Sequence, residues 1–359
     1  MPDNRTVYET ADVGNGGFWR FVATTAGDLS AGALYCAAFT QTTPNTTVGG
    51  AFTINWLPMG TTSDATVLGW VNGTANGQTT QVTFDDIFTV DLPTSATSGL
   101  CNAGFTSVNT GYTYTVNGVK YYNECLKLNA ANPNAAAQAA VLETVRYSAL
   151  LGCTTEFNKW EGITFSPRRK QVRARVVAGL ALCVLCLACL LPLPRCVCMC
   201  ADSGLVRLPP PQLYTAMSYF TSGGMLPTTS AAGVQNTGDI GGSQDIGVPA
   251  SACGCVYSLN VDANYVATDM TSMVCGTSQT ADANGNTCSP TGIANPDNVA
   301  IMDDFDTLII GEDTGLHRND FMWQARAWQW DMHLHCRGAA DMRVPAPLAR
   351  IMLQRCCMH

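Results

Sequence analysis

Carboxylate and amide side chains gather around two short apolar segments near residue 300. Asp297 stands at the start of the apolar segment Asn298–Met302, and Glu312 follows the apolar segment Thr307–Ile310. Charged residues make up only 13% of the chain, so composition does not explain this crowding. A strand that ends in a carboxylate can support a hard cation such as Ca²⁺, which prefers several oxygen ligands. The alternative is a polar turn between two solvated strands.

The same order of residues occurs twice more in the chain. Glu161 precedes the β-branched segment Ile163–Phe165, and Leu213–Ser218 has the form of its partner strand. Thr6–Asp12 has that second form too, with Asp12 at the exit of the strand. Three related copies of one unit predict a repeating all-β architecture with carboxylates at the strand ends.

The segment 172–212 differs in composition from its surroundings. It contains six of the seventeen cysteines, an excess of arginine and the unbroken apolar run Val176–Leu191. One interpretation is a membrane helix with a basic flank, although a spanning helix needs about 20 apolar residues. The other is a retained intron, because Val codons and the Gln codon CAG match the usual intron borders. Its removal would join Gln171 to Leu213 as strand, basic turn and strand.

The C-terminal segment 325–359 also lacks the pattern of the rest of the chain. It is rich in arginine and holds three of the four histidines. We expect a disordered tail that results from a frameshift or read-through, in preference to a histidine-based metal site. The expected organisation is therefore one β-structure in two parts, 1–171 and 213–324, interrupted by the insert and followed by this tail.

Charge and cysteine content limit the classes of function. The formal net charge is −8 and no basic patch is present, which argues against nucleic-acid binding. Outside the insert and the tail an even number of cysteines remains, as in a secreted disulfide protein. We expect Cys101–Cys125 and Cys275–Cys288 first among several open connectivities. Three glycosylation sequons suit the same compartment, and the first residues do not form a signal peptide. The eight cysteines are Cys36, Cys101, Cys125, Cys153, Cys253, Cys255, Cys275 and Cys288.

The elements that must position the carboxylates are mostly strands. A hairpin is predicted at Tyr112–Tyr122, because Asn117 and Gly118 form a turn whose twist matches paired strands. One helix is predicted at Asn134–Leu151, since its apolar residues lie on roughly one face, and it leads the chain towards Glu161. Further strands are predicted at Gly17–Thr24, Gly32–Thr40, Ala51–Pro58 and Thr66–Val71.

Several longer stretches together resemble the PhoX-type alkaline phosphatases of bacteria, cyanobacteria and algae. They are MPDNRTVYETAD, GGFWRFVATTAGDLSAGALY, GCTTEFNKWEGITF, LYTAMS, GIANPDN and DTLIIGEDTGLHRND. The resemblance implies a β-propeller with metal ions at its centre. It also implies hydrolysis of small phosphomonoesters that requires calcium, with iron in characterised members. The metal ligands that it implies are Glu161, Asp297, Glu312, Asp12 and, more weakly, Glu156.

On this interpretation the protein is a monomeric, secreted or cell-surface enzyme that scavenges phosphate. His317 and Arg318 are candidates for contact with the substrate phosphate, or else polar loop residues. The chain lacks the family's upstream metal motif and final blade, so we expect an incomplete propeller with little activity. Two other functions stay open: a non-catalytic, calcium-stabilised propeller that binds at the cell surface, and a membrane-tethered surface protein that uses 176–191.

Overall fold

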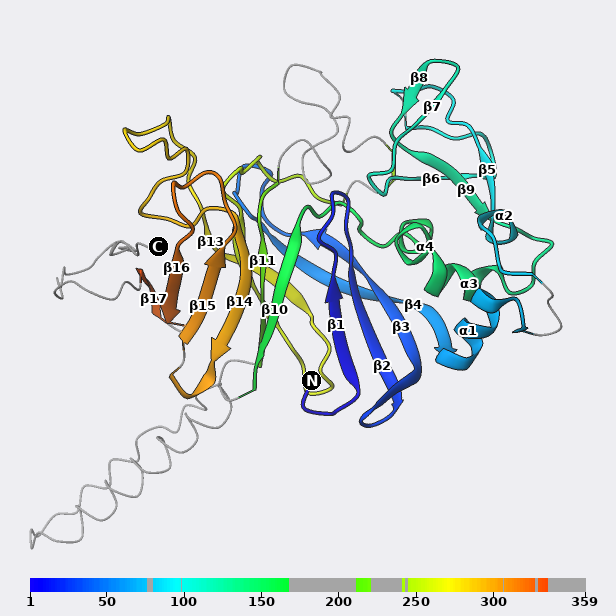
Figure 1. Ribbon diagram of the computed structural model, residues 1–359, viewed down its shortest axis with the longest axis horizontal. Helices are drawn as coiled ribbons and strands as arrows, with labels where there is room; N and C mark the ends of the chain where they lie inside the picture. Colours follow the sequence, from blue (N-terminus) through cyan, green and yellow to red (C-terminus); the bar gives the residue numbers. More distant parts are fainter. Residues whose placement is uncertain are drawn as a thin grey trace, which may run out of the picture.

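The computed structural model of this protein (Figure 1) describes residues 1–75, 80–97, 99–167, 211–220, 241–242, 245–305, 307–326 and 329–334. The apolar run 176–191 and most of the insert 172–212 lie outside these residues. None of the helices in the described ranges has the length and apolar character needed to cross a bilayer. The strands are β1 Thr6–Thr10, β2 Phe18–Thr25, β3 Asp28–Gln41, β4 Ala51–Ser63, β5 Phe88–Asp91, β6 Thr106–Val108, β7 Tyr114–Val116, β8 Val119–Tyr121, β9 Glu124–Leu128, β10 Trp160–Ser166, β11 Gln212–Met217, β12 Cys255–Asn260, β13 Asp269–Cys275, β14 Pro296–Met302, β15 Thr307–Glu312, β16 Met322–Arg326 and β17 Gln329–Leu334; the α-helices are α1 Asp64–Asn72, α2 Phe84–Ile87, α3 Ala135–Leu142 and α4 Thr144–Leu151.

The largest unit is an eight-stranded antiparallel sheet with the strand order β1-β2-β3-β4-β13-β12-β11-β10. It consists of two four-stranded meanders, β1–β4 and β10–β13, joined where β4 pairs with β13. The sheet curls until it is nearly closed and barrel-like. The fold is mostly β, which confirms the coarser part of the expected all-β class, whereas a propeller is not shown by these sheets.

The two outer strands of this sheet, β1 and β10, approach each other through the residues beside them. The amide of Lys159 donates to the carbonyl oxygen of Val13 at 2.9 Å. Gly16 and Phe157 exchange two backbone hydrogen bonds, of 2.7 and 3.2 Å. We call this contact of residues 11–16 with residues 157–160 the seam. Because residue numbers rise on one side as they fall on the other, β1 and β10 run in opposite directions.

A second, four-stranded sheet has the chain-order topology β14-β15-β16-β17 and lies beside β10 and β11 (Figure 1). The amide of Ile301 donates to Thr164 Oγ1 at 3.3 Å, and the hydroxyl of Ser166 donates to Asp303 Oδ1 at 2.7 Å. Residue numbers rise together on both sides, so β10 and β14 run in the same direction. The apolar side chains buried between the two sheets include Tyr214, Val256, Val299, Leu308, Ile310 and Trp323.

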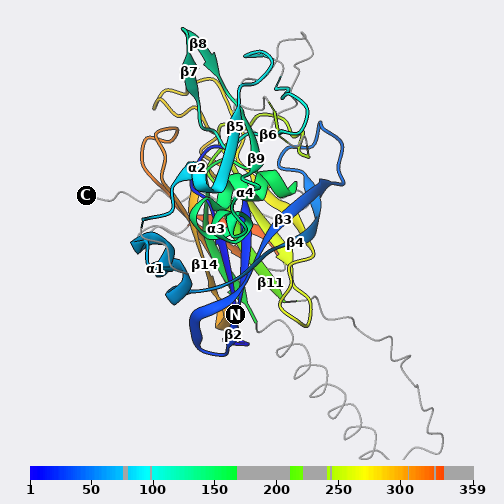
Figure 2. The same ribbon diagram turned by 90° about the vertical axis from the view of Figure 1, so that its right-hand side faces the viewer.

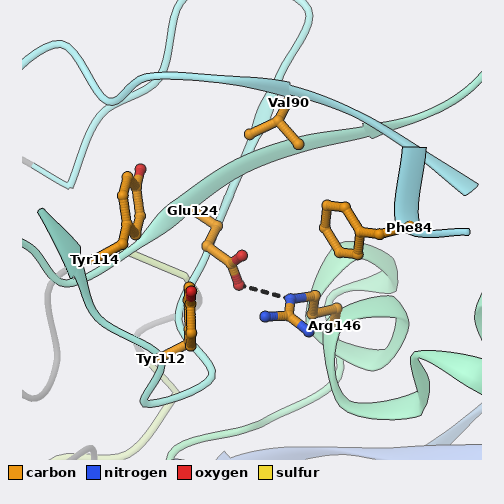
Figure 3. A pocket seen from close by; sticks show the side chains of 6 residues that line it. All are labelled: Phe84, Val90, Tyr112, Tyr114, Glu124 and Arg146. Atoms are coloured by element: carbon orange, nitrogen blue, oxygen red, sulfur yellow. Dashed lines mark hydrogen bonds and ion pairs between the residues drawn. The ribbon is translucent and has the colours of Figure 1, made fainter. Parts of the chain in front are cut away.

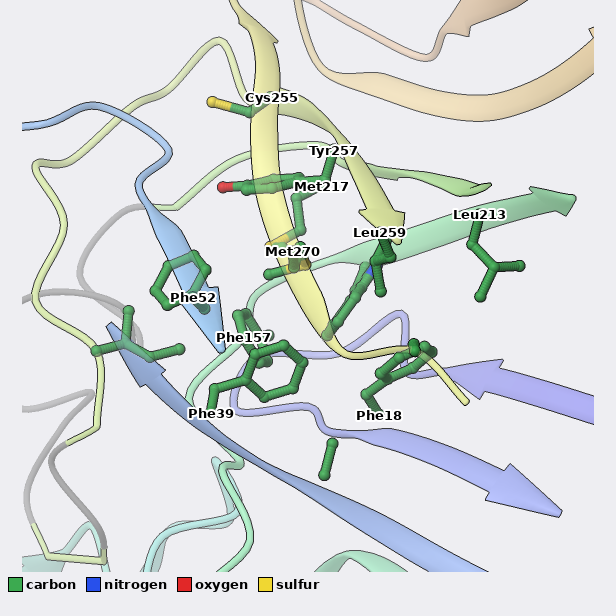
Figure 4. Packing of buried hydrophobic residues seen from close by; sticks show 14 of the residues in the cluster. Phe18, Phe39, Phe52, Phe157, Leu213, Met217, Cys255, Tyr257, Leu259 and Met270 are labelled. Atoms are coloured by element: carbon green, nitrogen blue, oxygen red, sulfur yellow. The ribbon is translucent and has the colours of Figure 1, made fainter. Parts of the chain in front are cut away.

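The interior of the eight-stranded sheet is aromatic (Figure 4). The ring of Trp160 stacks on Phe18 with centroids 4.9 Å apart, and it meets Phe157 edge-on at 4.5 Å. Its indole N–H donates to Thr215 Oγ1 at 2.6 Å, so the buried polar atom is satisfied. Burial of this residue in the core fixes the start of β10, because each large aromatic side chain removes about 150–250 Å² from water.

Residues 64–153 form a smaller unit at one end of the long strands β3 and β4 (Figures 1 and 2). It contains the four α-helices found in the described ranges, the three-stranded sheet β5-β9-β6 and the hairpin β7–β8. The disulfide Cys36–Cys153 joins its end to β3. Its own core continues into the outer face of the barrel-like sheet, since Trp19 and Met59 pack with Tyr147. We call this unit the insertion.

The predicted strand at Thr66–Val71 is wrong, because these residues belong to helix α1. The hydroxyl of Ser63 accepts a hydrogen bond from the amide of Thr66 at 3.3 Å and caps the first turn. Gly73, with φ of 68°, ends the helix in the left-handed conformation. The other three strands predicted in this part of the chain are confirmed as β2, β3 and β4.

The helix predicted at Asn134–Leu151 is confirmed in position but is divided into α3 and α4. Glu143 leaves the helical region, with φ of −135° and ψ of 47°, and turns the chain between them. Its carboxylate pairs with Arg146 at 2.7 Å. The predicted hairpin is confirmed as β7–β8, and both turn residues, Asn117 and Gly118, have the positive φ that a type I′ turn needs.

The two strands on either side of the insert 172–212 are direct neighbours. β10 and β11 pair antiparallel, and the last residue of β10, Ser166, lies opposite Gln212. The predicted partner strand Leu213–Ser218 is thus confirmed. Near the C-terminus, β17 pairs with β16 inside the segment 325–359, where we expected disorder and no strands, so that expectation is wrong for Gln329–Leu334. Residues 335–359 lie outside the described ranges.

All eight cysteines outside the insert and the tail form disulfides. The predicted pair Cys101–Cys125 is present. The predicted pair Cys275–Cys288 is wrong, because the strand register places Cys255 directly opposite Cys275. The bonds formed are Cys255–Cys275 and Cys253–Cys288, together with Cys36–Cys153.

Candidate functional site

Three carboxylates from distant parts of the chain meet where β1 ends and where β10 and β14 begin. Asp12 follows β1 in the seam, Glu161 is the second residue of β10, and Asp297 is the second residue of β14. Glu161 lies within hydrogen-bonding reach of both other carboxylates. We call these three residues the carboxylate cluster. Its side chains are accessible, since Asp12 is exposed and the other two are partly exposed.

Two facing β-bulges bring Glu161 and Asp297 together. The register of β10 shifts against β11 between Glu161 and Ile163, and that of β14 shifts against β15 between Pro296 and Val299. Bulges of this kind redirect side chains and are common beside functional sites. Gly162, at the first bulge, has φ of 56° and lies directly on the backbone of the second. The sequence therefore positions the cluster through a glycine that permits close approach.

Lys159 belongs to the seam and contacts the carboxylate cluster through its side chain. Its ammonium group pairs with Asp12 Oδ1 at 2.7 Å. Its backbone has φ of 46°, which is uncommon for a residue other than glycine. The backbone is held there on both sides, since its amide donates to Val13 and its carbonyl oxygen accepts from Ser218 at 3.0 Å. Sequence reasoning missed Lys159, because no residue pattern predicts that a lysine adopts the left-handed backbone conformation.

The three carboxylates do not all carry their ordinary charge. Partial burial, hydrogen bonding to Asp297 and Asp12, and repulsion by these two carboxylates together raise the pKa of Glu161 to about 8. Burial opposes ionisation of Asp12 as well, but hydrogen bonds from Lys159 and Glu161 lower its pKa below the ordinary value. At neutral pH the cluster therefore retains a proton on Glu161 and excess negative charge.

The cluster supplies oxygen donors only, which are the ligands that calcium and other hard cations prefer. Within the described residues, however, no three Asp, Glu, His or Cys side chains are arranged as a ready metal site. Glu161 lies within hydrogen-bonding reach of Asp12 and Asp297, and Lys159 pairs with Asp12. A bound cation would have to displace the proton on Glu161 and draw the oxygens around one centre. The donor chemistry fits calcium, and the arrangement requires local adjustment.

Known proteins do not identify this site. Comparison of the chain found no matching family model, no matching curated protein and no matching solved structure. The function must therefore be argued from the residues of this chain alone.

Glu312, predicted as a metal ligand, lies in a fully buried network of its own. Oε1 accepts hydrogen bonds from the amide of Ala294 at 2.8 Å and from Trp323 Nε1 at 2.6 Å. Oε2 accepts from the amide of Phe321 at 3.1 Å and lies 2.9 Å from His317 Nδ1. Four protein groups therefore occupy both oxygens. The structure does not bring this carboxylate to the cluster.

The other predicted residues are also used elsewhere in the fold. His317 is buried; its second ring nitrogen lies 3.2 Å from the carbonyl oxygen of Ser289. Burial lowers its pKa, but the hydrogen bond to Glu312 and the attraction between them outweigh this and raise the pKa above the ordinary value. Arg318 is an exposed loop residue. Glu156 is 3% exposed and accepts the amides of residues 245 and 246, each at 2.9 Å.

Proposed function

We propose that this protein is a metal-dependent phosphomonoesterase whose cation is held by Asp12, Glu161 and Asp297. The observation that carries the proposal is the meeting of three carboxylates from three strand ends, with a proton retained on Glu161. Partial burial and the two carboxylates beside it raise the pKa of Glu161, and a divalent cation would relieve the repulsion among the three groups better than a proton does. Calcium is the proposed cation, because all donors are oxygens. Iron is a second candidate, which the resemblance to the PhoX-type alkaline phosphatases implies.

The chemistry assigned to each group follows from its charge. A bound divalent cation would polarise the phosphoryl oxygens and offset the negative charge that develops on them. Lys159 is the cationic side chain beside the cluster, and its raised pKa, caused mainly by the hydrogen bond to Asp12, keeps it charged. It can donate to a phosphoryl oxygen once a cation takes over Asp12. His317 and Arg318 are not part of this proposal.

A propeller remains part of the proposal for the region from β10 onward. The meanders β10–β13 and β14–β17 each have four antiparallel strands in chain order, as propeller blades do. Their first strands run side by side in the same direction, and both carry a cluster carboxylate at the start. β1 runs opposite to β10, so the first meander does not support the blade arrangement in the same way.

The proposed setting is outside the cell or on its surface, with small phosphomonoesters as substrates and a monomeric protein. The four disulfides support an oxidising compartment. The acidic net charge of −8 supports small substrates over nucleic acid.

The first test is calcium binding, measured by calorimetry and by the shift of the thermal unfolding temperature. Asp12→Asn and Asp297→Asn should each weaken binding at least tenfold, whereas Glu9→Gln, an exposed carboxylate on β1, should not. Calcium-dependent release of phosphate from an aryl phosphate is the second readout. Absence of calcium binding to the unaltered protein would overturn the proposal.

A second candidate is a non-catalytic, calcium-stabilised binding protein. It is favoured by one observation: of the two predicted phosphate-contacting residues, His317 is buried against Glu312 and Arg318 is an exposed loop residue, so neither is placed in the cluster. Calcium binding without any phosphate release would support this second function over the first.

A further inference from the structure

A cavity of about 410 Å³ lies within the insertion, away from the carboxylate cluster. Figure 3 shows its lining: aromatic rings and an aliphatic side chain form the walls around an ion pair. This volume lies in the range of small-molecule sites, which combine apolar walls with a few polar groups. The lining residues are Phe84, Val90, Tyr112, Tyr114, Glu124 and Arg146.

The ion pair places a donor and an acceptor next to each other in the cavity. Arg146 Nε donates to Glu124 Oε2 at 2.8 Å, and its Nη1 donates to Glu143 Oε2 at 2.7 Å. Among the described residues, neither Arg146 Nη2 nor Glu124 Oε1 has a hydrogen-bond partner. A hydroxyl group both donates and accepts, so two neighbouring hydroxyls match this pair of free atoms.

The charges around the cavity disfavour an ionic ligand of either sign. Arg146 pairs with two carboxylates, Glu124 and Glu143, which together exceed its charge by one, so an anion such as phosphate gains little from it. A cation would face the guanidinium group itself, which lies 5.2 Å from the ring centre of Phe84 and 5.3 Å from that of Tyr112. The charge balance points to a neutral, polyhydroxylated ligand.

Three tyrosine rings extend the cavity wall along the hairpin β7–β8. The rings of Tyr112 and Tyr114 are 6.2 Å apart and inclined by 19°, and those of Tyr114 and Tyr121 are 5.4 Å apart and inclined by 17°. Burial raises the pKa of Tyr114 to about 12, with Glu124 adding to the shift, so its phenol stays neutral. Tyr112 is 52% exposed, which leaves a large apolar face in solvent.

We propose that this cavity binds a neutral oligosaccharide of hexose units. The apolar C–H face of one sugar ring packs on Tyr112, and two adjacent hydroxyls bind Arg146 Nη2 and Glu124 Oε1. The following unit lies along the row of tyrosines. This site is separate from the carboxylate cluster in both chemistry and location, and it does not depend on the proposed hydrolysis.

The test uses the full chain in the presence of EDTA, so that cation binding plays no part. Maltotriose, mannotriose and galactotriose are the probes, with saturation-transfer NMR and calorimetry as the readouts. At least one of them should bind, and Tyr112→Ala should weaken that binding at least tenfold. Phe305→Ala is the matched control, because Phe305 is an aromatic residue that is 70% exposed and does not line the cavity.

A second variant separates sugar recognition from simple exposure of a tyrosine. Arg146→Lys keeps the positive charge but removes the planar donor pair, so it should also weaken binding at least tenfold. Near-ultraviolet circular dichroism checks that each variant is folded. The proposal is overturned if none of the three sugars binds, if Tyr112→Ala binds as tightly as the unaltered chain, or if inorganic phosphate displaces the sugar.

Discussion

Gly162 lies against the backbone of Asp297 so closely that a Cβ atom on Gly162 would be 2.7 Å from the carbonyl oxygen of Asp297. The contact joins two bulges, one at the start of β10 and one at the start of β14. Because Glu161 and Asp297 adjoin this contact, the distance between their carboxylates depends on a residue that carries no functional group.

Gly162→Ala is expected to destabilise the fold and to weaken cation binding together. The methyl group would meet three backbone atoms within 2.9 Å, and φ of 56° is strained for alanine. We expect a loss of about 2–3 kcal/mol in the free energy of unfolding, measured by urea titration. Gly118→Ala is the control, since Gly118 has φ of 77° but open space around it. An equal loss in both variants would show that the close contact is unimportant.

Glu161→Gln should make the cation-free protein more stable at alkaline pH. The pKa of Glu161 is about 8 in the folded chain and 4.5 ordinarily, so the folded state holds the extra proton between these values. The free energy of unfolding contributed by this group therefore falls as pH rises from about 4.5 to 8. Glutamine resembles the protonated form of Glu161 and stays neutral as the pH rises, so its contribution does not fall. Thermal unfolding at pH 5 and pH 9 in EDTA measures the difference.

Calcium should reverse the order of stability of the unaltered chain and Glu161→Gln. The unaltered chain should gain stability on addition of calcium, most strongly above pH 8, where Glu161 is ionised. Glu161→Gln should gain little, because one ligand charge is lost. Glu9→Gln serves as the control in the same buffers. If calcium stabilises Glu161→Gln as much as the unaltered chain, Glu161 is not a ligand.

Glu312→Gln should unfold more easily without a specific change in cation binding. An amide can accept on only one side, so two of the four donors around this buried carboxylate lose their partner. We expect a loss of about 3 kcal/mol or more in the free energy of unfolding. The raised pKa of His317 means that the pair stabilises the fold fully below the ordinary histidine pKa and less as pH rises through the folded value. The effect of the substitution should therefore shrink at alkaline pH.

Removal of residues 172–211 should leave the eight-stranded sheet intact. Ser166 and Gln212 face each other at the ends of paired strands, so the remaining residues between them can close a hairpin. A shorter connection also costs less closure entropy, and the unfolding temperature should stay the same or rise. Circular dichroism and thermal unfolding of the shortened chain provide the measurement. A substantial fall in the unfolding temperature would mean that the removed segment stabilises the fold.

Local sequence patterns predicted most of the strands that hold the site. The segments after Glu161, after Asp297 and before Glu312 are short, apolar and bounded by turn residues, so the sequence predicted β10, β14 and β15 directly. The strand predicted over helix α1 failed because its caps, Ser63 and Gly73, outweighed the β-branched residues between them.

Features that depend on distant pairing could not be predicted. Nothing in the sequence states that β4 pairs with β13, and this pairing makes one sheet from two meanders. The register that places Cys255 opposite Cys275 has the same origin. For the candidate site, the sequence predicted Asp12, Glu161 and Asp297 separately, each from its position beside an apolar segment. Only the folded structure separated them from Glu312, whose four hydrogen-bond donors come from other segments.

The seam has a consequence for the order of events during folding. Asp12 lies on one side of it and Glu161 beside the other, and backbone hydrogen bonds, among them the one from Lys159 to Val13, close it. A cation that bridges the two carboxylates would therefore hold the seam together. It could bind only to chains in which β1 and β10 have already come together. A bound cation would therefore indicate that the eight-stranded sheet has closed. Loss of the cation would make the seam the first part of the sheet to open.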